Sequence, residues 1–235
     1  MAACLQPSAL ANAVLSEKLP AELLPPWEDW TAGLDAEAML DQAGWIDADD
    51  DPTTPRVAQG INGVFDMTPL SLSLLTSQAE LDQQIGTWIV TRLGDCGIEV
   101  HWQSLPTAEL YAPGPDGVLF GRQFDLALLS WQTAGQDPCR LYLSKAVPSA
   151  DNAWIGTNVA GWADPAFDLA CGEKQMRFDP PESQDAWELL KATLPAIPLL
   201  PPPVVWASSL DVVIPEGAVW QQIESFGKPN PEEGS

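Results

Sequence analysis

A strand, a helix and a second strand follow one another over residues 70–105, and this order constrains the fold more than any other feature of the chain. Residues 70–77 (LSLSLLTS) alternate leucine with serine, which predicts a strand with one buried face. Apolar residues then recur at helical spacing, and GIEVHWQSL over 97–105 predicts the next strand. The helical stripe consists of Leu81, Ile85, Trp88, Ile89 and Leu93. Because a helical connection joins parallel strands, the sequence predicts an α/β fold with a mixed, largely parallel sheet and covering helices.

Capping residues mark several helix boundaries. Ser77 and Glu80 have the spacing of a capping box at the start of the helix just described. Asp35 is the expected N-cap of a short helix over 35–45, and Asp164 of a helix that begins at a proline. The other predicted elements are helices over 8–19, 106–112 and 180–194, and a strand over 124–131 (FDLALLSW).

Charge excludes two classes of partner. Among 235 residues, 33 are acidic and 10 basic, so the net charge is −23. Such a chain repels the phosphates of nucleic acids and anionic lipid headgroups, so neither is expected as a partner. No apolar run approaches the ~20 residues of a transmembrane helix. The first residues lack a basic segment followed by an apolar one, so no signal peptide is predicted at Met1.

One acidic segment has the spacing that begins an EF-hand calcium loop, with Asp47, Asp49 and Asp51. Pro52 stands where that loop needs glycine, and Ala58 stands where it needs the bidentate glutamate. The segment is therefore predicted to be a solvated turn.

The sequence offers little for catalysis. His101 is the single histidine and lies beside Trp102 in a predicted strand, where a structural or surface role is favoured. No GxSxG, Walker, HExxH or GxGxxG motif occurs, and scattered cysteines with one histidine do not suit a zinc site. No cofactor, metal or catalytic residue is therefore expected. A carboxylate-dependent hydrolase stays open as an alternative, because Asp and Glu are abundant.

Four widely spread cysteines allow three disulfide connectivities. Buried free thiols in a cytosolic protein are one interpretation. Two disulfides in an exported protein are the preferred one, with Cys4–Cys96 and Cys139–Cys171 as the first choice.

Several short motifs follow one another in a specific order. A short helix ends in Ala-Gly-Trp at 43–45, a later helix leads into GIEV, and FDLALLSW runs into an acidic, proline-containing turn. An Asn…Gly…Asp-Pro-Ala-Phe-Asp segment over 158–168 and LPAIPLL over 194–200 complete the series. In this order, from about Cys4 to Phe226, the chain resembles the family 5 extracellular solute-binding proteins, the peptide- and dipeptide-type receptors of ABC importers.

The resemblance implies a periplasmic-binding-protein type II-like fold, in which two lobes close on the ligand. Residues 1–200 are similar to the second, ligand-cleft lobe, and residues 201–235 resemble the segment that returns toward the first lobe, followed by a frayed tail. The N-terminal part of the first lobe has no counterpart here, so a partial protein is expected.

The resemblance also nominates a solute site. Its cleft is lined by the turn after the FD…W strand and by the Asn…Gly loop, so Trp131 is the expected aromatic platform for the solute. The other nominated contacts are Gln132, Thr133, Gln136 and Asp137 on the turn, and Asn158, Gly161 and Trp162 on the loop. The alternative for Trp131 is a core position at the end of a strand, and for Trp154 and Trp162 it is anchoring of the loop.

The nominated disulfides gain a purpose in this setting. Cys139–Cys171 would tie the two cleft-lining segments together, and Cys4–Cys96 would clamp the first helix to the end of the helix before GIEV.

One position leaves the solute open. Ala134 stands three residues after Trp131, where peptide-binding members have an acidic residue for the peptide amine. The solute is then a peptide or another small solute, such as a sugar or a metal chelate. The implied function is non-catalytic solute binding by a monomer outside the cytoplasm, in the periplasm or at the cell surface, with ABC-transporter permease subunits as partners. A folded fragment that binds nothing without its facing lobe is the other alternative, beside the hydrolase.

Overall fold

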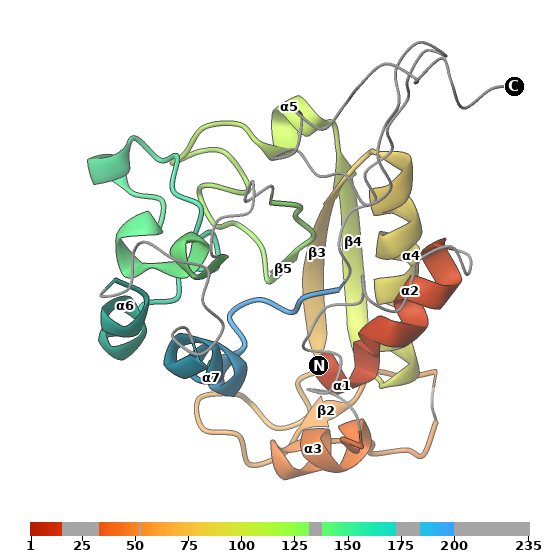
Figure 1. Ribbon diagram of the computed structural model, residues 1–235. Helices are drawn as coiled ribbons and strands as arrows, with labels where there is room; N and C mark the ends of the chain where they lie inside the picture. Colours follow the sequence, from red (N-terminus) through yellow and green to blue (C-terminus); the bar gives the residue numbers. More distant parts are fainter. Residues whose placement is uncertain (16–32, 52, 132–137, 173–183, 200–235) are drawn as a thin grey trace, which may run out of the picture. The chain divides into compact units, whose positions relative to one another are not determined.

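Three parallel strands form the centre of the fold, in the order β4-β3-β5. The computed structural model describes residues 1–15, 33–51, 53–131, 138–172 and 184–199 (Figure 1). Strand β3 (Ser71–Ser77) leads through α4 (Glu80–Asp95) into β4 (Glu99–Leu105), which pairs with β3 in parallel. The short strand β5 (Leu126–Ala127) pairs in parallel with the other side of β3. The predicted mixed α/β fold with a parallel sheet and helices is confirmed.

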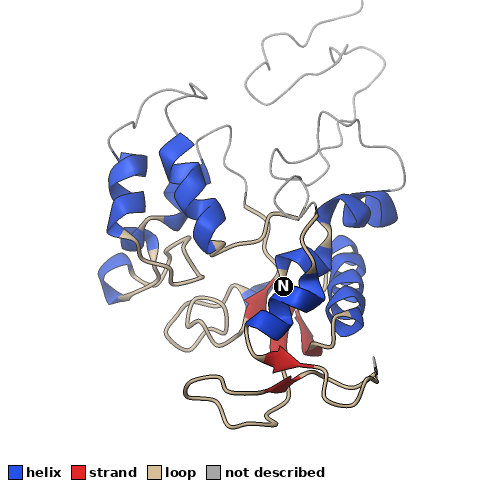
Figure 2. Cartoon of the chain, turned by 90° about the horizontal axis from the view of Figure 1, so that it is seen from below, coloured by secondary structure: helices blue, strands red, loops and turns tan. Residues whose placement is uncertain are grey.

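The helix α4 packs on β3 and β4 through the predicted stripe. Ile85, Ile89 and Leu93 are buried in one cluster with Leu74 of β3. Gly86 permits this close approach, because a Cβ there would lie 2.6 Å from the Trp102 ring. Two N-terminal helices, α1 (Ala2–Leu5) and α2 (Pro7–Leu15), also contact α4, and Figure 2 shows the strands flanked by helices.

Strand β3 is buried on both faces toward its carboxyl end, so the prediction of a single buried face is wrong there. Leu74 is 1% exposed and joins the cluster under α4, whereas Leu75 is 3% exposed and joins a second cluster with Val159. The buried hydroxyl of Thr76 accepts a hydrogen bond from Trp102 Nε1 over 2.9 Å. Central strands of parallel sheets are normally covered on both sides, and a bonded hydroxyl can be buried at little cost.

The capping box predicted from Ser77 and Glu80 is wrong. Ala79 is the N-cap of α4, and the Ser77 hydroxyl accepts a hydrogen bond from Ala79 N over 3.1 Å. The same hydroxyl donates to Asp82 Oδ2 over 2.5 Å. The partner on the first helical turn is therefore Asp82, two residues later than the spacing predicted.

Strand β5 is much shorter than the strand predicted over 124–131, and just before its start a side chain occupies the position of the next ladder bond. Asp125 Oδ2 accepts hydrogen bonds from Ser73 N over 2.8 Å and from Ser73 Oγ over 2.7 Å. Beyond β5, Leu128 N still donates to Leu75 O over 2.8 Å. The Asp125 carboxylate thus fastens this edge to the centre of the sheet.

The N-terminal helix prediction around Asp35 is confirmed. Asp35 caps α3 (Ala36–Gln42) by accepting a hydrogen bond from Ala38 N over 3.0 Å. The acidic turn that follows is closed by its own carboxylates, with Asp47 Oδ1 accepting from the backbone N–H groups of Asp49 and Asp50.

A two-stranded antiparallel sheet, β1 (Trp45–Ile46) with β2 (Val57–Ala58), was not predicted from the sequence. The residue that fixes it is Arg56, which is 8% exposed, forms an ion pair with Asp41 and donates to the carbonyl oxygen of Trp45. Sequence reasoning missed this sheet because its strands are too short to show a periodic pattern.

The later part of the described chain is built from short helices. Cys139, Leu143, Phe167 and Cys171 form a third buried cluster with Ala186 and Leu190. Asp164 caps the helix that begins at Pro165, as predicted, because its Oδ1 accepts hydrogen bonds from the backbone N–H groups of Ala166 and Phe167. These elements are α5 (Thr107–Leu110), η3 (Pro138–Tyr142), η4 (Ser144–Ala146), η5 (Ala150–Asn152), α6 (Pro165–Gly172) and α7 (Gln184–Thr193).

Both predicted disulfides are present. Cys4–Cys96 joins α1 to the end of α4 across 6.2 Å between Cα atoms, and Cys139–Cys171 joins η3 to α6 across 6.0 Å. The proposed boundary at residue 200 remains a prediction, because residues 200–235 lie outside the described ranges. Among the helices that are described, none combines the length and hydropathy needed to cross a bilayer.

The Asp125 clamp gives a pH-dependent prediction. Hydrogen bonds from the backbone and the hydroxyl of Ser73 hold the pKa of Asp125 below its usual value. A carboxyl whose pKa is lower in the folded state stabilises the fold above the unfolded pKa of about 3.9, and this contribution is lost as the pH falls through the folded pKa. Asp125→Asn should therefore lower the free energy of unfolding at neutral pH, and this difference from the unaltered protein should shrink as the pH falls below the unfolded pKa of about 3.9 and through the folded pKa.

Urea unfolding at neutral and acid pH measures this difference. The control is Asp151→Asn, because Asp151 lies exposed on η5. Equal midpoints for Asp125→Asn and the unaltered protein at neutral pH would contradict the role of the clamp.

Candidate functional site

The carboxyl edge of the parallel sheet is the candidate site. From β3 the chain passes through α4 to β4 on one side, and it later returns to β5 on the other side. In open α/β sheets, ligands bind outside the carboxyl ends of the strands where the strand order reverses in this way. Here that point lies between the ends of β3 and β5. Trp131, four residues beyond β5, follows this edge and is partly exposed.

Polar side chains gather where β3 ends. The Ser77 hydroxyl bonds to Asp82, and Gln83 Nε2 donates to the carbonyl oxygen of Ser77 over 2.8 Å and to Ser104 Oγ. Burial, and secondarily the negative charge of Asp82, raise the pKa of Tyr111. The phenol therefore stays protonated at neutral pH and can donate a hydrogen bond.

Sequence reasoning missed this polar group. Its members come from β3, α4, β4 and the residue after α5, so only tertiary packing brings them together. The available signal was the position of Ser77 and Ser104 at the ends of two parallel strands, which meet at one edge of the sheet.

The loop over 156–162 lies against the same end of the sheet. Val159 is 7% exposed and packs in one cluster with Leu75 of β3, and Leu129, two residues before Trp131, packs against that cluster. The nominated strand end and the nominated loop are therefore brought together, by apolar residues that were not themselves nominated.

Asn158 bonds to the backbone around its loop. Its side chain is fully buried, and Nδ2 donates to the carbonyl oxygens of Tyr142, Leu143 and Trp162 over 2.9, 3.1 and 2.7 Å. Its backbone N–H donates to Ala146 O over 2.9 Å. The amide thus fixes the course of the loop by donating to carbonyl groups on both sides of it, and a contact between Asn158 and a solute remains a prediction.

Gly161 adopts a left-handed backbone with φ +69°, and a Cβ there would overlap Arg122 Nη1. The close approach places a guanidinium group over the loop, which the sequence did not indicate because Arg122 is distant in the chain. Arg122 itself is exposed.

The two loop tryptophans lie against other parts of the protein. The Trp162 ring meets Phe167 edge-on, with 4.7 Å between ring centroids and an interplanar angle of 61°. Trp154 has φ +59°, and a Cβ on Gly114 would lie 2.8 Å from its ring. Both rings are only partly exposed, and these contacts support loop anchoring.

Four nominated residues lie outside the described ranges: Gln132, Thr133, Gln136 and Asp137. Their contacts with a solute remain predictions, as does the consequence of Ala134. His101 lies on β4 with its side chain 69% exposed, 3.7 Å from Glu99 Oε2. Within the described ranges, no group of three His, Cys, Asp or Glu side chains is placed to hold a metal ion.

No protein-family model matches the sequence, and no curated protein matches it. Solved structures do match. The oligopeptide-binding protein of Thermus thermophilus, complexed with a pentapeptide, aligns with a TM-score of 0.63 at 20% identity, over 85% of this chain and 36% of that one. The oligopeptide-binding protein AppA from Bacillus subtilis, in complex with a nonapeptide, aligns with a TM-score of 0.58 at 17% identity. The alignment covers 97% of this chain and 46% of that one.

A third match binds a different kind of solute. NikZ from Campylobacter jejuni, in complex with Ni(L-His), gives a TM-score of 0.60 at 15% identity, over 84% of this chain and 40% of that one. These likenesses show the fold, which is that of the periplasmic solute-binding proteins. The chain spans less than half the length of each of the three proteins.

Removal of the Asn158 amide should destabilise the fold. Asn158→Ala takes the side-chain donor from the carbonyl groups of Tyr142 and Trp162, whereas Leu143 O keeps the backbone N–H of Ala146, and the free energy of unfolding should fall by about 2 kcal/mol. Denaturant unfolding measures the loss.

Asn152→Ala is the matched control. Asn152 also donates to two backbone carbonyls, those of Val147 and Lys145, but in a partly exposed position where water can replace the amide. Its loss should be clearly smaller. Equal losses for the two variants would show that burial of the Asn158 amide is not what matters.

Proposed function

We propose that this chain binds a small solute non-catalytically, as part of the receptor of an ABC importer, and that the carboxyl edge of its sheet forms one wall of the solute site. The observation that carries the proposal is the partly exposed Trp131 at the point where the strand order reverses, in a fold shared with solute-binding proteins. The membership in family 5 and the correspondence to a C-terminal lobe belong to this proposal.

The wall consists of an aromatic ring with polar groups nearby. An indole face provides affinity for many solutes because it needs no matched partner, while hydroxyl and carboxylate groups fix orientation. On this chain those groups are the Ser77–Asp82 pair and Tyr111 at the end of β3. The turn residues Gln132, Thr133, Gln136 and Asp137 complete the proposed wall, and Gly161 and Trp162 shape the loop beside it.

Peptides and metal chelates are the proposed solute classes. Two similar structures hold peptides and one holds a nickel–histidine complex, so the same fold accommodates both kinds. Because no bond is made or broken, no catalytic residue and no cofactor belongs to the proposal.

The proposed setting is outside the cytoplasm, with permease subunits of the transporter as partners of a monomer. Two disulfides support an oxidising compartment. The net charge of −23 favours a monomer, because like-charged copies of the chain repel one another.

Indole N–H resonances test the proposal directly, because weak binding by a single wall is still visible by NMR. On titration with penta-alanine or nickel–histidine, the Trp131 indole signal, assigned by its loss in Trp131→Phe, should shift and saturate. Trp131→Ala should weaken binding about tenfold, as expected for the loss of roughly 1.4 kcal/mol of ring contact.

Another tryptophan serves as an internal control. Trp88 Nε1 donates to Leu5 O where α1 packs on α4, away from the proposed wall. Its signal should stay in place throughout the titration. Shifts of the same size at Trp88 and Trp131, or none at Trp131 with any probe, would refute the proposed wall.

A further inference from the structure

A pocket opens beside one of the two disulfides, away from the proposed solute wall. Its volume is about 300 Å³, and both Cys4 and Cys96 line it. The remaining walls come from the start of α3 and from the last turn of α4, including Arg92 and Asp95. Both residues of this disulfide therefore lie in the wall of a pocket.

The two disulfides differ in their exposure. Cys139 and Cys171 are 5% and 7% exposed and belong to a buried cluster. Cys4 is 3% exposed, but its partner Cys96 is only partly buried, at the end of α4. An attacking thiolate needs access to one of the two sulfur atoms, and Cys96 is the more exposed of the two residues.

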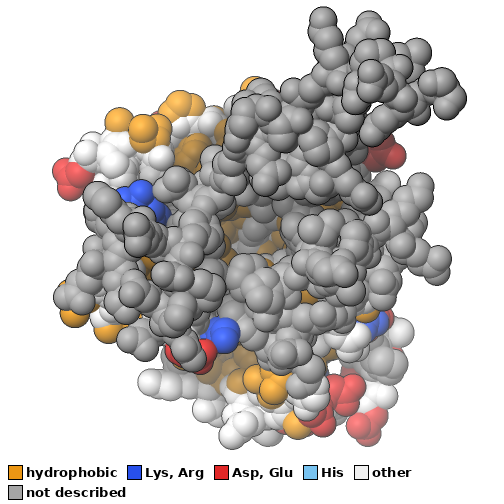
Figure 3. All heavy atoms as spheres, in the orientation of Figure 1, with side chains coloured by type: hydrophobic (Ala, Val, Ile, Leu, Met, Phe, Trp, Pro, Cys, Tyr) orange, Lys and Arg blue, Asp and Glu red, His pale blue; other side chains and the backbone are white. Residues whose placement is uncertain are grey.

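The charges around the pocket select among thiols. Among the described residues that line it, Asp35, Glu37 and Asp95 are acidic and Arg92 is the one cation, so their summed charge is negative, as is that of the whole chain. Figure 3 shows a group of acidic side chains at the lower right of the molecule. A cationic thiol is therefore concentrated near the pocket and an anionic one is repelled.

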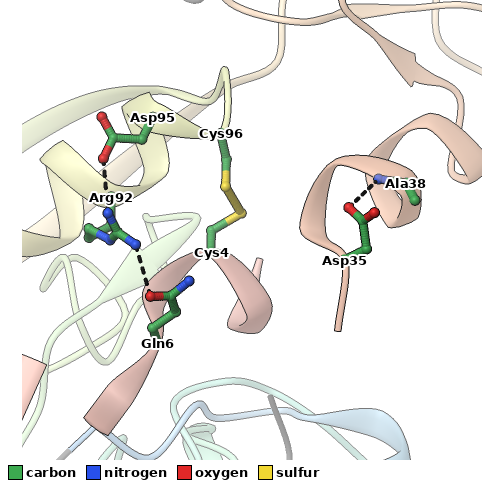
Figure 4. The surroundings of a disulfide bond; sticks show 7 residues. All are labelled: Cys4, Gln6, Asp35, Ala38, Arg92, Asp95 and Cys96. Atoms are coloured by element: carbon green, nitrogen blue, oxygen red, sulfur yellow. Dashed lines mark hydrogen bonds and ion pairs between the residues drawn. A yellow bond between two sulfur atoms is a disulfide. The ribbon is translucent and has the colours of Figure 1, made fainter. Parts of the chain in front are cut away.

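Arg92 lines the same pocket and is held in place. Its guanidinium donates to Gln6 Oε1 over 3.0 Å and pairs with Asp95 Oδ2 over 3.2 Å, as Figure 4 shows. Its Nε is buried and has no hydrogen-bond partner among the described residues. A positive charge in the pocket favours the thiolate form of a cysteine released there.

We propose that Cys4–Cys96 is a thiol-exchange site that accepts small cationic thiols. The thiolate of the incoming molecule attacks Cys96 Sγ and forms a mixed disulfide. The bond to Cys4 breaks, its electron pair leaves with Cys4 Sγ, and that sulfur takes a proton from water. A second thiolate of the same kind attacks the mixed disulfide, releases the small-molecule disulfide and leaves Cys96 reduced.

The exchange changes how the N-terminal helices are attached. With the bond intact, α1 is covalently fixed to the end of α4. After exchange, the attachment relies on apolar packing, the bond from Trp88 Nε1 to Leu5 O, and the bond from Arg92 to Gln6. Modification at Cys96 thus converts a covalent link into a reversible contact.

The test uses the full oxidised chain under native conditions. It is treated with cysteamine, which carries an ammonium group, or with 2-mercaptoethanesulfonate, which carries a sulfonate, and free cysteines are then alkylated and mapped by mass spectrometry. Cys4 and Cys96 should react at least about tenfold faster than Cys139 and Cys171, which serve as the internal control. Circular dichroism confirms that the fold persists.

The charge selectivity has its own variants. At equal thiolate concentration and low salt, cysteamine should react about fivefold faster than the sulfonate, and about 0.5 M salt should reduce this ratio. Asp35→Asn combined with Glu37→Gln should reduce it too, since asparagine still caps α3. Asp151→Asn should leave it unchanged.

Three outcomes would overturn the proposal. If Cys139 and Cys171 react as fast as Cys4 and Cys96, or if Cys4 and Cys96 react only after unfolding, then Cys4–Cys96 is not an exchange site. A faster reaction with the sulfonate would remove the selectivity for cations.

Discussion

The burial of β3 on both faces is the constraint on which the rest of the described structure depends. Leu74 and Leu75 point into different clusters, so each face of this one strand needs its own cover. The helix α4 covers the first face, backed by α1 and α2. The second face is covered by short helical and loop segments, among them the loop that carries Val159. A wall of the candidate site is thus a consequence of core packing, because the loop lies where Leu75 must be sealed from water.

Regular patterns made much of the first half of this architecture predictable. The stripe from Leu81 to Leu93 predicts both the helix and its buried face, and Asp35 and Asp164 mark helix starts that the structure confirms. The failures occur where a side chain substitutes for backbone pairing. Asp125 accepts a hydrogen bond from the backbone N–H of Ser73 just before β5 begins. Ser77 donates its hydrogen bond to Asp82, where the sequence predicted a pairing with Glu80. Such substitutions depend on which groups meet in space, and local spacing does not carry that information.

The exposure of the nominated residues could be predicted only in part, and their contacts with a solute remain predictions. Trp131 lies partly exposed at the sheet edge, whereas the side chain of Asn158 is buried. An asparagine in a glycine-containing loop is equally suited to a ligand and to unpaired backbone carbonyls. Here the side chain bonds to the backbone, because the 3₁₀ helix before the loop ends at Tyr142 and the carbonyl group of that residue needs a donor. That preference follows from the tertiary path of residues 138–146, which no short window of sequence specifies.

The two disulfides lie where packing alone secures the chain least. Cys139–Cys171 joins a five-residue 3₁₀ helix to α6, and such a short helix gains little stability from its own hydrogen bonds. Cys4–Cys96 fixes α1, a helix of four residues, to α4. The parallel strands need no such bond, because burial on both faces already holds them. In a chain with a net charge of −23, repulsion between segments opposes compact folding, and a covalent link holds a short helix in place against it.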